Sequence, residues 1–257
     1  MLRPRIIPCL LIHKNGLTKT VNFSQHKYLG DPLNAIRIFN EKEADELFVA
    51  DIDATVHGRE PNYKLIENLA SECRMPFCYA GGIKTVEQAE RIINLGVEKV
   101  GISSAAIENP NLIAEISQRL GNQSVVVVFD IKKVGLFKSY EIFTHNGMQS
   151  SGLNPIEFSK KIEKLGAGEI LINSIDCDGI MNGYDLELVK SIRKSINLPL
   201  SVLGGAGSYE HIKTLIKTNG VIGACVGSFF VFKGKYKAVL IQYPSRAEKN
   251  TILSELK

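Results

Sequence analysis

The feature of this sequence that most constrains its fold is an internal repeat at an interval of 123 residues, the separation between the glycine pairs at 81–82 and 204–205. Asp-Ile-Asp at 51–53 precedes the first pair by the same distance at which Ser-Ile-Asp at 174–176 precedes the second. Because the interval is nearly half of the 257 residues, it predicts two similar halves joined in tandem.

Strand-like and helix-like patterns alternate along the chain, which predicts a parallel sheet covered by helices. Asp31 and Pro32 are typical of a helix start, as are Asn109 and Pro110, and Gly121 is typical of a helix end. The predicted strands span residues 5–12, 46–51, 76–80, 98–102, 124–131, 168–174, 198–203 and 221–226.

Two copies of a four-strand unit predict one closed α/β barrel of the TIM type, a (βα)8 barrel. We expect the barrel to occupy residues 1–244, with half-barrels at about 1–122 and 123–244, and residues 245–257 to form a short solvated tail. The segment GKYKAVLIQYP, ending at Pro244, predicts an extended end to the barrel instead of a long eighth helix. The alternative is an open doubly wound sheet, which would not need the second half to copy the first.

The composition, 44% hydrophobic and 23% charged, is that of an ordinary globular protein. The net charge of +4 fits anionic small molecules but implies no partner by itself, and we expect no nucleic-acid binding. No apolar run approaches the roughly 18 residues that span a membrane, and the N-terminus lacks signal-peptide features. Five cysteines without CxxC or matching histidine spacing predict free thiols and no metal site, so we expect a cytoplasmic protein.

Small residues at the predicted strand ends indicate two phosphate sites, since the functional site of a TIM barrel lies at the C-terminal ends of its strands. Glycine lets backbone N–H groups approach an anion, and a serine hydroxyl adds a donor. A single glycine pair also suits an ordinary turn, but this pattern recurs at symmetry-related strands. Two such sites at one barrel end fit an elongated ligand with a phosphate at each end. The first phosphate site comprises Gly81, Gly82 and Ser103 or Ser104, and the second comprises Gly204, Gly205, Gly227 and Ser228.

Four carboxylates also fall at predicted strand ends. Asp130 follows the apolar run VVVVF, where an acid contributes nothing to the core, and it is therefore the best catalytic candidate. The alternative is that Asp130 caps a loop or forms a salt bridge. Asp176 and Asp178 can orient loops or substrate hydroxyls, and Asp178 is included among the substrate-binding candidates. Asp51 ends the second predicted strand.

Several segments together resemble the cyclase subunit of imidazole glycerol phosphate synthase, HisF. They include RIIPCL, ELFVADIDA, AGGI, GAGEILINSID, DGIMNGYD and GGAGSYEH, and the likeness runs collinearly from residue 1 to about 232. The resemblance implies a barrel that works with a HisH-type glutaminase at its N-terminal face and needs no cofactor. Ammonia from that partner would cross the barrel axis and join a bis-phosphorylated ribulosyl nucleotide at the C-terminal face.

The resemblance also implies two catalytic aspartates, at the ends of strands one and five. Asp130 matches the second, but Leu11 stands where the first belongs. Loss of a general acid or base typically costs about 10²–10⁴-fold in rate, and Leu11 adds an apolar side chain beside a polar substrate. Lys19 matches a flexible-loop lysine of the family. Ile180 and Ser103 replace the Thr and Asn that are usual there.

The N-terminal end of the barrel keeps the family's pattern. The family closes it with a ring of two basic and two acidic side chains, the gate through which ammonia enters, and the matching residues are Arg5, Glu46, Lys99 and Glu169. Charges near a barrel axis are costly unless they are paired, so we expect a closed ionic ring. The alternative is four unrelated charges at the solvent edge.

An intact gate with half of the catalytic pair missing resembles a HisF-like subgroup, the glycosyl amidation-associated (WbuZ) type found with O-antigen and other surface-polysaccharide genes. Shared segments are RIIPCLL, NEKE, GGAGS, GSFFVF and AVLIQYP. Members are thought to supply ammonia, with a HisH-like glutaminase, to a separate sugar amidotransferase. We therefore expect an ammonia-conducting subunit. The alternatives are a working cyclase of histidine biosynthesis, which Leu11 argues against, and a scaffold that only activates the glutaminase, which the ring argues against.

Overall fold

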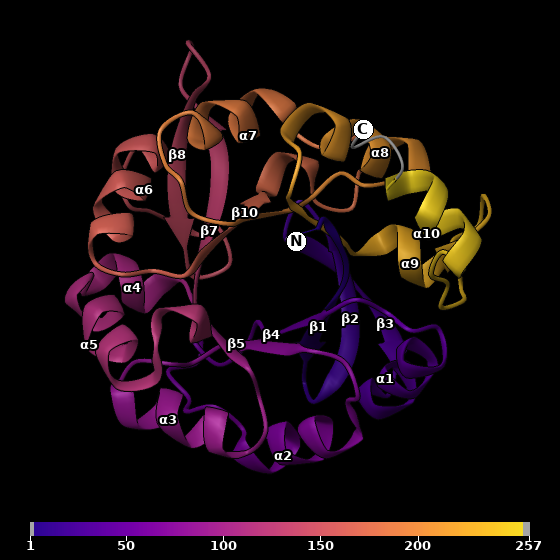
Figure 1. Cartoon of the computed structure of the whole chain (residues 1–257), viewed down its shortest axis with the longest axis horizontal. Helices are drawn as coiled ribbons and strands as arrows, with labels where there is room; N and C mark the ends of the chain where they lie inside the picture. Colours follow the sequence, from indigo (N-terminus) through magenta and orange to yellow (C-terminus); the bar gives the residue numbers. More distant parts are fainter. Residues whose placement is uncertain (1–2, 254–257) are drawn as a thin grey trace.

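The structure is a computed structural model and describes residues 3–253. Eight parallel strands form a closed barrel with helices around it (Figure 1), as predicted. Neighbouring strands pair in chain order, and pairing of the first with the last and of the two half-barrels with each other closes the ring. The barrel strands are β1 (Arg5–His13), β4 (Leu47–Asp51), β5 (Phe77–Ala80), β6 (Lys99–Ile102), β7 (Val125–Val134), β10 (Glu169–Ser174), β11 (Leu200–Leu203) and β12 (Gly223–Val226).

The helices start and end where local chemistry favours it. Asp31 accepts a hydrogen bond from the N–H of Asn34 at the start of α1, and Pro32 is its first residue. Gly121, with φ of 86°, ends α5. The helices are α1 (Pro32–Glu41), α2 (Tyr63–Glu72), α3 (Val86–Asn94), α4 (Ser104–Glu108), α5 (Asn111–Leu120), α6 (Pro155–Lys164), α7 (Leu186–Arg193), α8 (Tyr209–Asn219), α9 (Ser228–Val231) and α10 (Arg246–Leu253), with 3-10 turns at Asn122–Ser124 and Ile175–Cys177.

The sequence analysis missed short strands in the loops that follow β1, β7 and β12. The β1–β2 and β2–β3 turns each have two central residues with positive φ, Lys14–Asn15 and Asn22–Phe23, which is the geometry of tight hairpins. The segment predicted to be extended, 234–244, begins with a turn over 234–237, and the rest of it contains no helix. Within that rest, Gln242 donates its N–H to Phe230 O at 2.8 Å. The additional strands are β2 (Gly16–Val21), β3 (Ser24–Gly30), β8 (Ser139–Thr144), β9 (Gln149–Ser150), β13 (Phe232–Lys233) and β14 (Ala238–Val239).

Within the predicted short solvated tail over residues 245–257, the described part forms the helix α10, and most of its side chains are exposed. Ser245 and Glu248 start this helix with a reciprocal capping box: the N–H of Ser245 donates to Glu248 Oε2 at 2.8 Å, and the N–H of Glu248 donates to Ser245 Oγ at 3.3 Å. Ile252 is buried in the outer core. Residues 254–257 lie outside the described residues.

Side chains alternate along each barrel strand between an outer apolar cluster, shared with the helices, and an inner cluster that fills the barrel. In β1, Ile6 belongs to the outer cluster, whereas Ile7 and Cys9 belong to the inner one. Arg5 and Leu11 share the parity of Ile7 and Cys9. One face of β1 therefore carries the charged residue at the start of the strand and the leucine at its end.

The chain segment before α10 is attached to the start of β1 by one buried hydroxyl. Tyr243 Oη donates to Ile6 O at 2.9 Å and accepts from the N–H of Asp45 at 3.1 Å. Tyr243→Phe should lower the free energy of unfolding by about 1–3 kcal/mol, because two buried backbone groups lose a partner. Urea unfolding measures this, with Tyr236→Phe as a control at a side chain that is 88% exposed. Equal stability of the two variants would contradict the assigned role.

Candidate active site

A cavity of about 280 Å³ opens at the C-terminal ends of the barrel strands, and both predicted phosphate sites line it. The structure therefore brings together side chains that are far apart in the sequence. The predicted residues that line this cavity are Leu11, Lys19, Gly81, Gly82, Ser103, Ser104, Asp130, Asp178, Gly204, Gly205, Gly227 and Ser228.

The predicted first phosphate site lies where β5 and β6 end. Gly81 has φ of 125°, and a Cβ there would overlap the carbonyl oxygen of Asp51, so the close approach of these two loops requires glycine. The Ser103 hydroxyl is buried without a hydrogen-bond partner in the described structure. Ser104 Oγ accepts from the N–H of His145 at 3.4 Å. An unpartnered buried donor is what a site for an anion would present.

The predicted second phosphate site contains a buried amine. A Cβ on Gly205 would overlap Gly183 O, so backbone packs directly on backbone at this loop. Lys19 is 4% exposed, its Nζ donates to Cys9 O at 2.6 Å, and the amine would lie 2.8 Å from a Cβ on Gly227. Burial lowers the pKa of Lys19. Lys19 lies in strand β2, not in an irregular loop as the resemblance implied, because the chain after β1 turns back in a hairpin.

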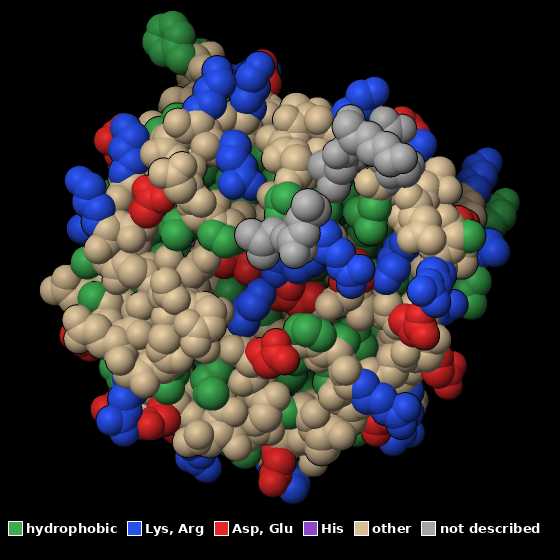
Figure 2. Space-filling model, in the orientation of Figure 1, with side chains coloured by type: hydrophobic (Ala, Val, Ile, Leu, Met, Phe, Trp, Pro, Cys, Tyr) green, Lys and Arg blue, Asp and Glu red, His purple; other side chains and the backbone are tan. Residues whose placement is uncertain are grey.

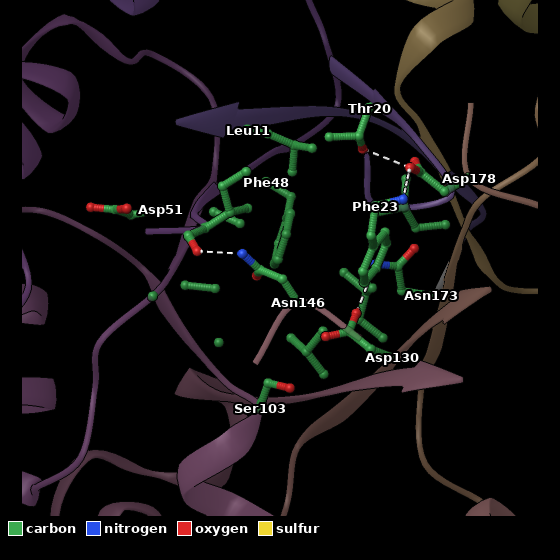
Figure 3. Close-up of a pocket in the computed structure, with 18 of the residues that line it drawn as sticks. Leu11, Thr20, Phe23, Phe48, Asp51, Ser103, Asp130, Asn146, Asn173 and Asp178 are labelled. Atoms are coloured by element: carbon green, nitrogen blue, oxygen red, sulfur yellow. Dashed lines mark hydrogen bonds between the residues drawn. The ribbon is translucent and has the colours of Figure 1, made fainter. Parts of the chain in front are cut away.

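The Asp130 carboxylate lies on one wall of the cavity, beside Asn173 (Figure 3). Asn173 Nδ2 donates to Asp130 Oδ1 at 2.8 Å, while Asn173 Oδ1 is buried without a partner in the described structure. Burial raises the pKa of Asp130 to about 7; the bond from Asn173 opposes the shift, and the charge of Asp178 adds to it. A carboxyl group with this pKa can take up or release a proton near neutral pH.

The wall opposite Asp130 is apolar. In Figure 3, Leu11 points into the cavity from β1, and the rings of Phe48 and Phe23 lie between Leu11 and Asp130. Phe23 comes from the β2–β3 turn, which is held by Asp178: Oδ2 of this residue accepts from the N–H of Phe23 at 3.1 Å and from Thr20 Oγ1 at 2.6 Å. The side chain at position 11 has no proton to exchange with a ligand.

Like Asp178, the candidate carboxylates Asp51 and Asp176 hold loops. Asp51 points away from the cavity in Figure 3, and its Oδ1 accepts from the N–H groups of Asp53 and Ala54 at 2.9 and 3.1 Å. Asp176 Oδ2 accepts from the N–H of Lys133 at 2.8 Å. Both therefore orient backbone around the mouth.

The polar and aromatic cavity residues that the sequence did not predict include Asn173, Phe23 and Asn146. Asn173 had a detectable signal, since it is a polar residue near the end of an apolar strand. Phe23 and Asn146 had none, because turns place them: Asn146 Nδ2 donates to Ile52 O at 2.8 Å and joins the β7–α6 loop to the β4–α2 loop.

At the opposite end of the barrel, the four predicted charges form a closed ring of ion pairs. Arg5 Nη1 contacts Glu46 Oε2, and Arg5 Nη2 lies 2.7 Å from Glu169 Oε1. Lys99 Nζ lies 2.8 Å from Glu46 Oε1 and 3.0 Å from Glu169 Oε2. Burial alone would lower the pKa of Lys99, but the charges of Glu169 and Glu46 outweigh burial and raise it. Figure 2 shows basic and acidic side chains meeting in the central hollow of one face.

Within residues 3–253, no group of three or more His, Cys, Asp or Glu side chains could hold a metal ion. The five cysteines are free thiols. No helix in the same range is long and apolar enough to cross a membrane.

Comparison with known proteins agrees with this architecture. Residues 5–237 match the family described as histidine biosynthesis protein. A Leptospira borgpetersenii protein, provisionally named imidazole glycerol phosphate synthase subunit HisF, is 56% identical over 252 residues, which cover 98% of this chain and 99% of that protein. The imidazole glycerol phosphate synthase subunit HisF of Exiguobacterium sibiricum is 42% identical over 230 residues, covering 90% and 91% of the two chains. The chain therefore belongs to the histidine biosynthesis protein family and, within it, to the HisF family of imidazole glycerol phosphate synthase subunits.

Proposed function

We propose that this protein is the HisF-like synthase subunit of a glutamine amidotransferase pair and conducts ammonia from a HisH-like glutaminase through its barrel. The observation that carries this proposal is the closed ring of Arg5, Glu46, Lys99 and Glu169 at one end of the barrel, with a cavity lined by paired glycines, serines and Lys19 at the other end. The glutaminase would dock at the ring, where the barrel strands begin.

The interior between the two ends suits a small neutral molecule. The inner cluster there consists of apolar side chains and thiols, among them Ile7, Cys9, Cys78, Val126 and Cys225. An unpaired ion inside such an interior costs several kcal/mol even after relaxation. Ammonia would therefore pass at much lower cost than ammonium, and the ring would keep out bulk water.

The mouth would bind a ligand with a phosphate at each end. Lys19 would neutralise the phosphate at the second site, since its buried amine lies against Gly227. Asp130 would exchange protons with the middle of the ligand, where its raised pKa suits proton transfer near neutral pH. Leu11 removes the second proton-transfer group, so cyclisation at this mouth would be slow or absent.

From this imbalance we infer that the ammonia leaves for another acceptor, a sugar that a separate amidotransferase modifies for a surface polysaccharide. The support is chemical: the ring is complete, while the acid–base pair is not. The second candidate function is cyclase activity in histidine biosynthesis. It is favoured by the retained Asp130 with its raised pKa, and the relatives carry names of that pathway.

Crystals soaked in phosphate should show two bound anions, one at Gly82 with Ser103 or Ser104, and one at Gly205 with Ser228. Lys19→Met should weaken phosphate binding at the second site about tenfold or more, because a desolvated charge-assisted contact is lost. The first site serves as the internal control and should keep its anion. Density at neither site would contradict the assignment of phosphate sites.

The unmodified protein, supplied with excess ammonia and the bis-phosphorylated ribulosyl nucleotide, should form little or no imidazole product. Leu11→Asp should recover part of the roughly 10²–10⁴-fold that one general acid or base contributes. Leu11→Asn is the matched control, since it adds polarity without a carboxylate that can transfer a proton. Turnover by the unmodified protein at the rate of an authentic cyclase would favour the histidine pathway and overturn the proposed glycan role.

Lys99→Ala should uncouple glutamine hydrolysis from delivery of ammonia. The ring would lose one cation and leave two carboxylates partly unpaired, with a loss of stability of up to about 3 kcal/mol for a side chain that is 18% exposed. The measurement is glutamine consumed per acceptor amidated in the reconstituted system. Lys160→Ala, which removes a surface ion pair on α6, is the control. An unchanged ratio in a folded Lys99→Ala protein would mean that ammonia does not travel through the barrel.

A further inference from the structure

Ser201, a fifth polar side chain, is joined to the ring, although the family resemblance assigns it no role. Ser201 lies in β11 and is 1% exposed. Its hydroxyl donates to Glu169 Oε1 and accepts from Arg5 Nη2 at 3.4 Å. The hydroxyl therefore contacts both members of one ion pair, and a serine at this position is not a packing residue of the inner cluster.

The strand between Ser201 and Arg5 has a glycine at the same level. Gly223 of β12 pairs with Arg5 of β1 on one side and with Ser201 of β11 on the other. The Arg5 side chain must therefore extend past β12 and β11 to reach Glu169 of β10. Three neighbouring strands contribute an arginine, a glycine and a serine to one layer of the barrel.

Gly223 is needed for space and not for backbone conformation. Its φ lies outside the left-handed region, so another residue could adopt the same backbone. A Cβ at this position would overlap Ser201 Oγ and come within 3.0 Å of Ile7 Cδ1. The Ser201 hydroxyl therefore fits beside a glycine at position 223, but it would overlap the side chain of any larger residue there.

The two carboxylates of the ring are held unequally as a result. Glu46 receives donors from Arg5 and Lys99. Glu169 accepts hydrogen bonds from both of these cations and an additional one from the Ser201 hydroxyl. The Ser201 hydroxyl is a neutral donor and stays in place when one of the two cations is removed. The Glu169 carboxylate should therefore keep its orientation after that removal.

We propose that Ser201 and Gly223 are positioning residues of the ring. Gly223 leaves the space that the Ser201 hydroxyl occupies, and Ser201 fixes the Glu169 carboxylate that Arg5 binds. The Arg5–Glu169 half of the ring then stays closed when Lys99 is displaced. A gating role for the ring rests on the proposed function. The positioning role does not, because the position of Arg5 can be observed in this protein without its partners.

Crystal structures of Lys99→Met and of Lys99→Met with Ser201→Ala test the proposal. In the single variant, Arg5 Nη2 should remain within hydrogen-bonding distance of Glu169 Oε1. In the double variant, the Arg5 side chain should leave this position or divide between conformers. Lys99→Met with Ser191→Ala is the control, since Ser191 Oγ bonds only within α7. Departure of Arg5 in the single variant, or an unmoved Arg5 in the double variant, would overturn the proposal.

A second pair of variants tests the fit between the two residues without relying on Lys99. Gly223→Ala should unfold at a lower urea concentration than the unmodified protein, because the new methyl group overlaps the Ser201 hydroxyl. Adding Ser201→Ala should recover most of that loss. A Gly223→Ala variant as stable as the unmodified protein, or a double variant no more stable than Gly223→Ala alone, would contradict the proposed fit.

Coupling to the glutaminase separates this proposal from the proposed function. If Arg5 moves in the double variant and the ratio of glutamine consumed to acceptor amidated rises, both stand. If Arg5 moves while that ratio is unchanged even in Lys99→Met, the positioning role stands and the gate fails. If Arg5 does not move, the positioning role fails whatever the ratio does.

Discussion

Charge pairing inside a closed barrel is the constraint on which the rest of this structure depends. Two basic and two acidic side chains project into an interior whose inner cluster above them is apolar, and each would be costly there without a partner. They are tolerated because barrel closure brings β1, β4, β6 and β10 to a common axis, where Arg5 and Lys99 each contact both Glu46 and Glu169. The ring therefore depends on closure of the barrel.

The alternation of side chains in a strand links this ring to the mouth. Arg5, Ile7, Cys9 and Leu11 share one face of β1, so the same strand contributes a charge at the bottom, apolar atoms in the middle and an apolar side chain at the top. A carboxylate at the end of that face would complete an acid–base pair with Asp130 across the cavity. Leu11 leaves that acid–base pair incomplete, whereas Ile7 and Cys9, nearer the start of the strand, do not depend on which residue stands at position 11.

The residues of the cavity suit the proposed binding of anions better than they suit proton transfer. Lys19 is buried at the proposed second phosphate site, and the unpartnered Ser103 hydroxyl lies at the proposed first site. Asp130 keeps a pKa near neutrality because of its burial. These features support ligand binding more strongly than they support cyclisation, which is why the proposed function assigns delivery of ammonia, and not ring closure, to this barrel.

The sequence by itself determined the features that depend on pattern. The repeat of 123 residues predicted a closed barrel of two similar halves, and the positions of the residues within the predicted strands placed the charged residues at one end and the glycine pairs at the other. The departure at Leu11 was also readable, because the family resemblance implies an aspartate at this position. The capping box of Ser245 and Glu248 was readable too, although it was overlooked.

Only the tertiary structure decided the features that depend on contacts between distant elements. The β1–β2 hairpin buries the amine of Lys19 beside Gly227, and the β2–β3 turn places Phe23 in the mouth through Asp178. Cross-strand register brings Ser201 to the Arg5–Glu169 pair. No local pattern in the sequence specifies these contacts, because each depends on how neighbouring strands are aligned and on which side chains leave space for others.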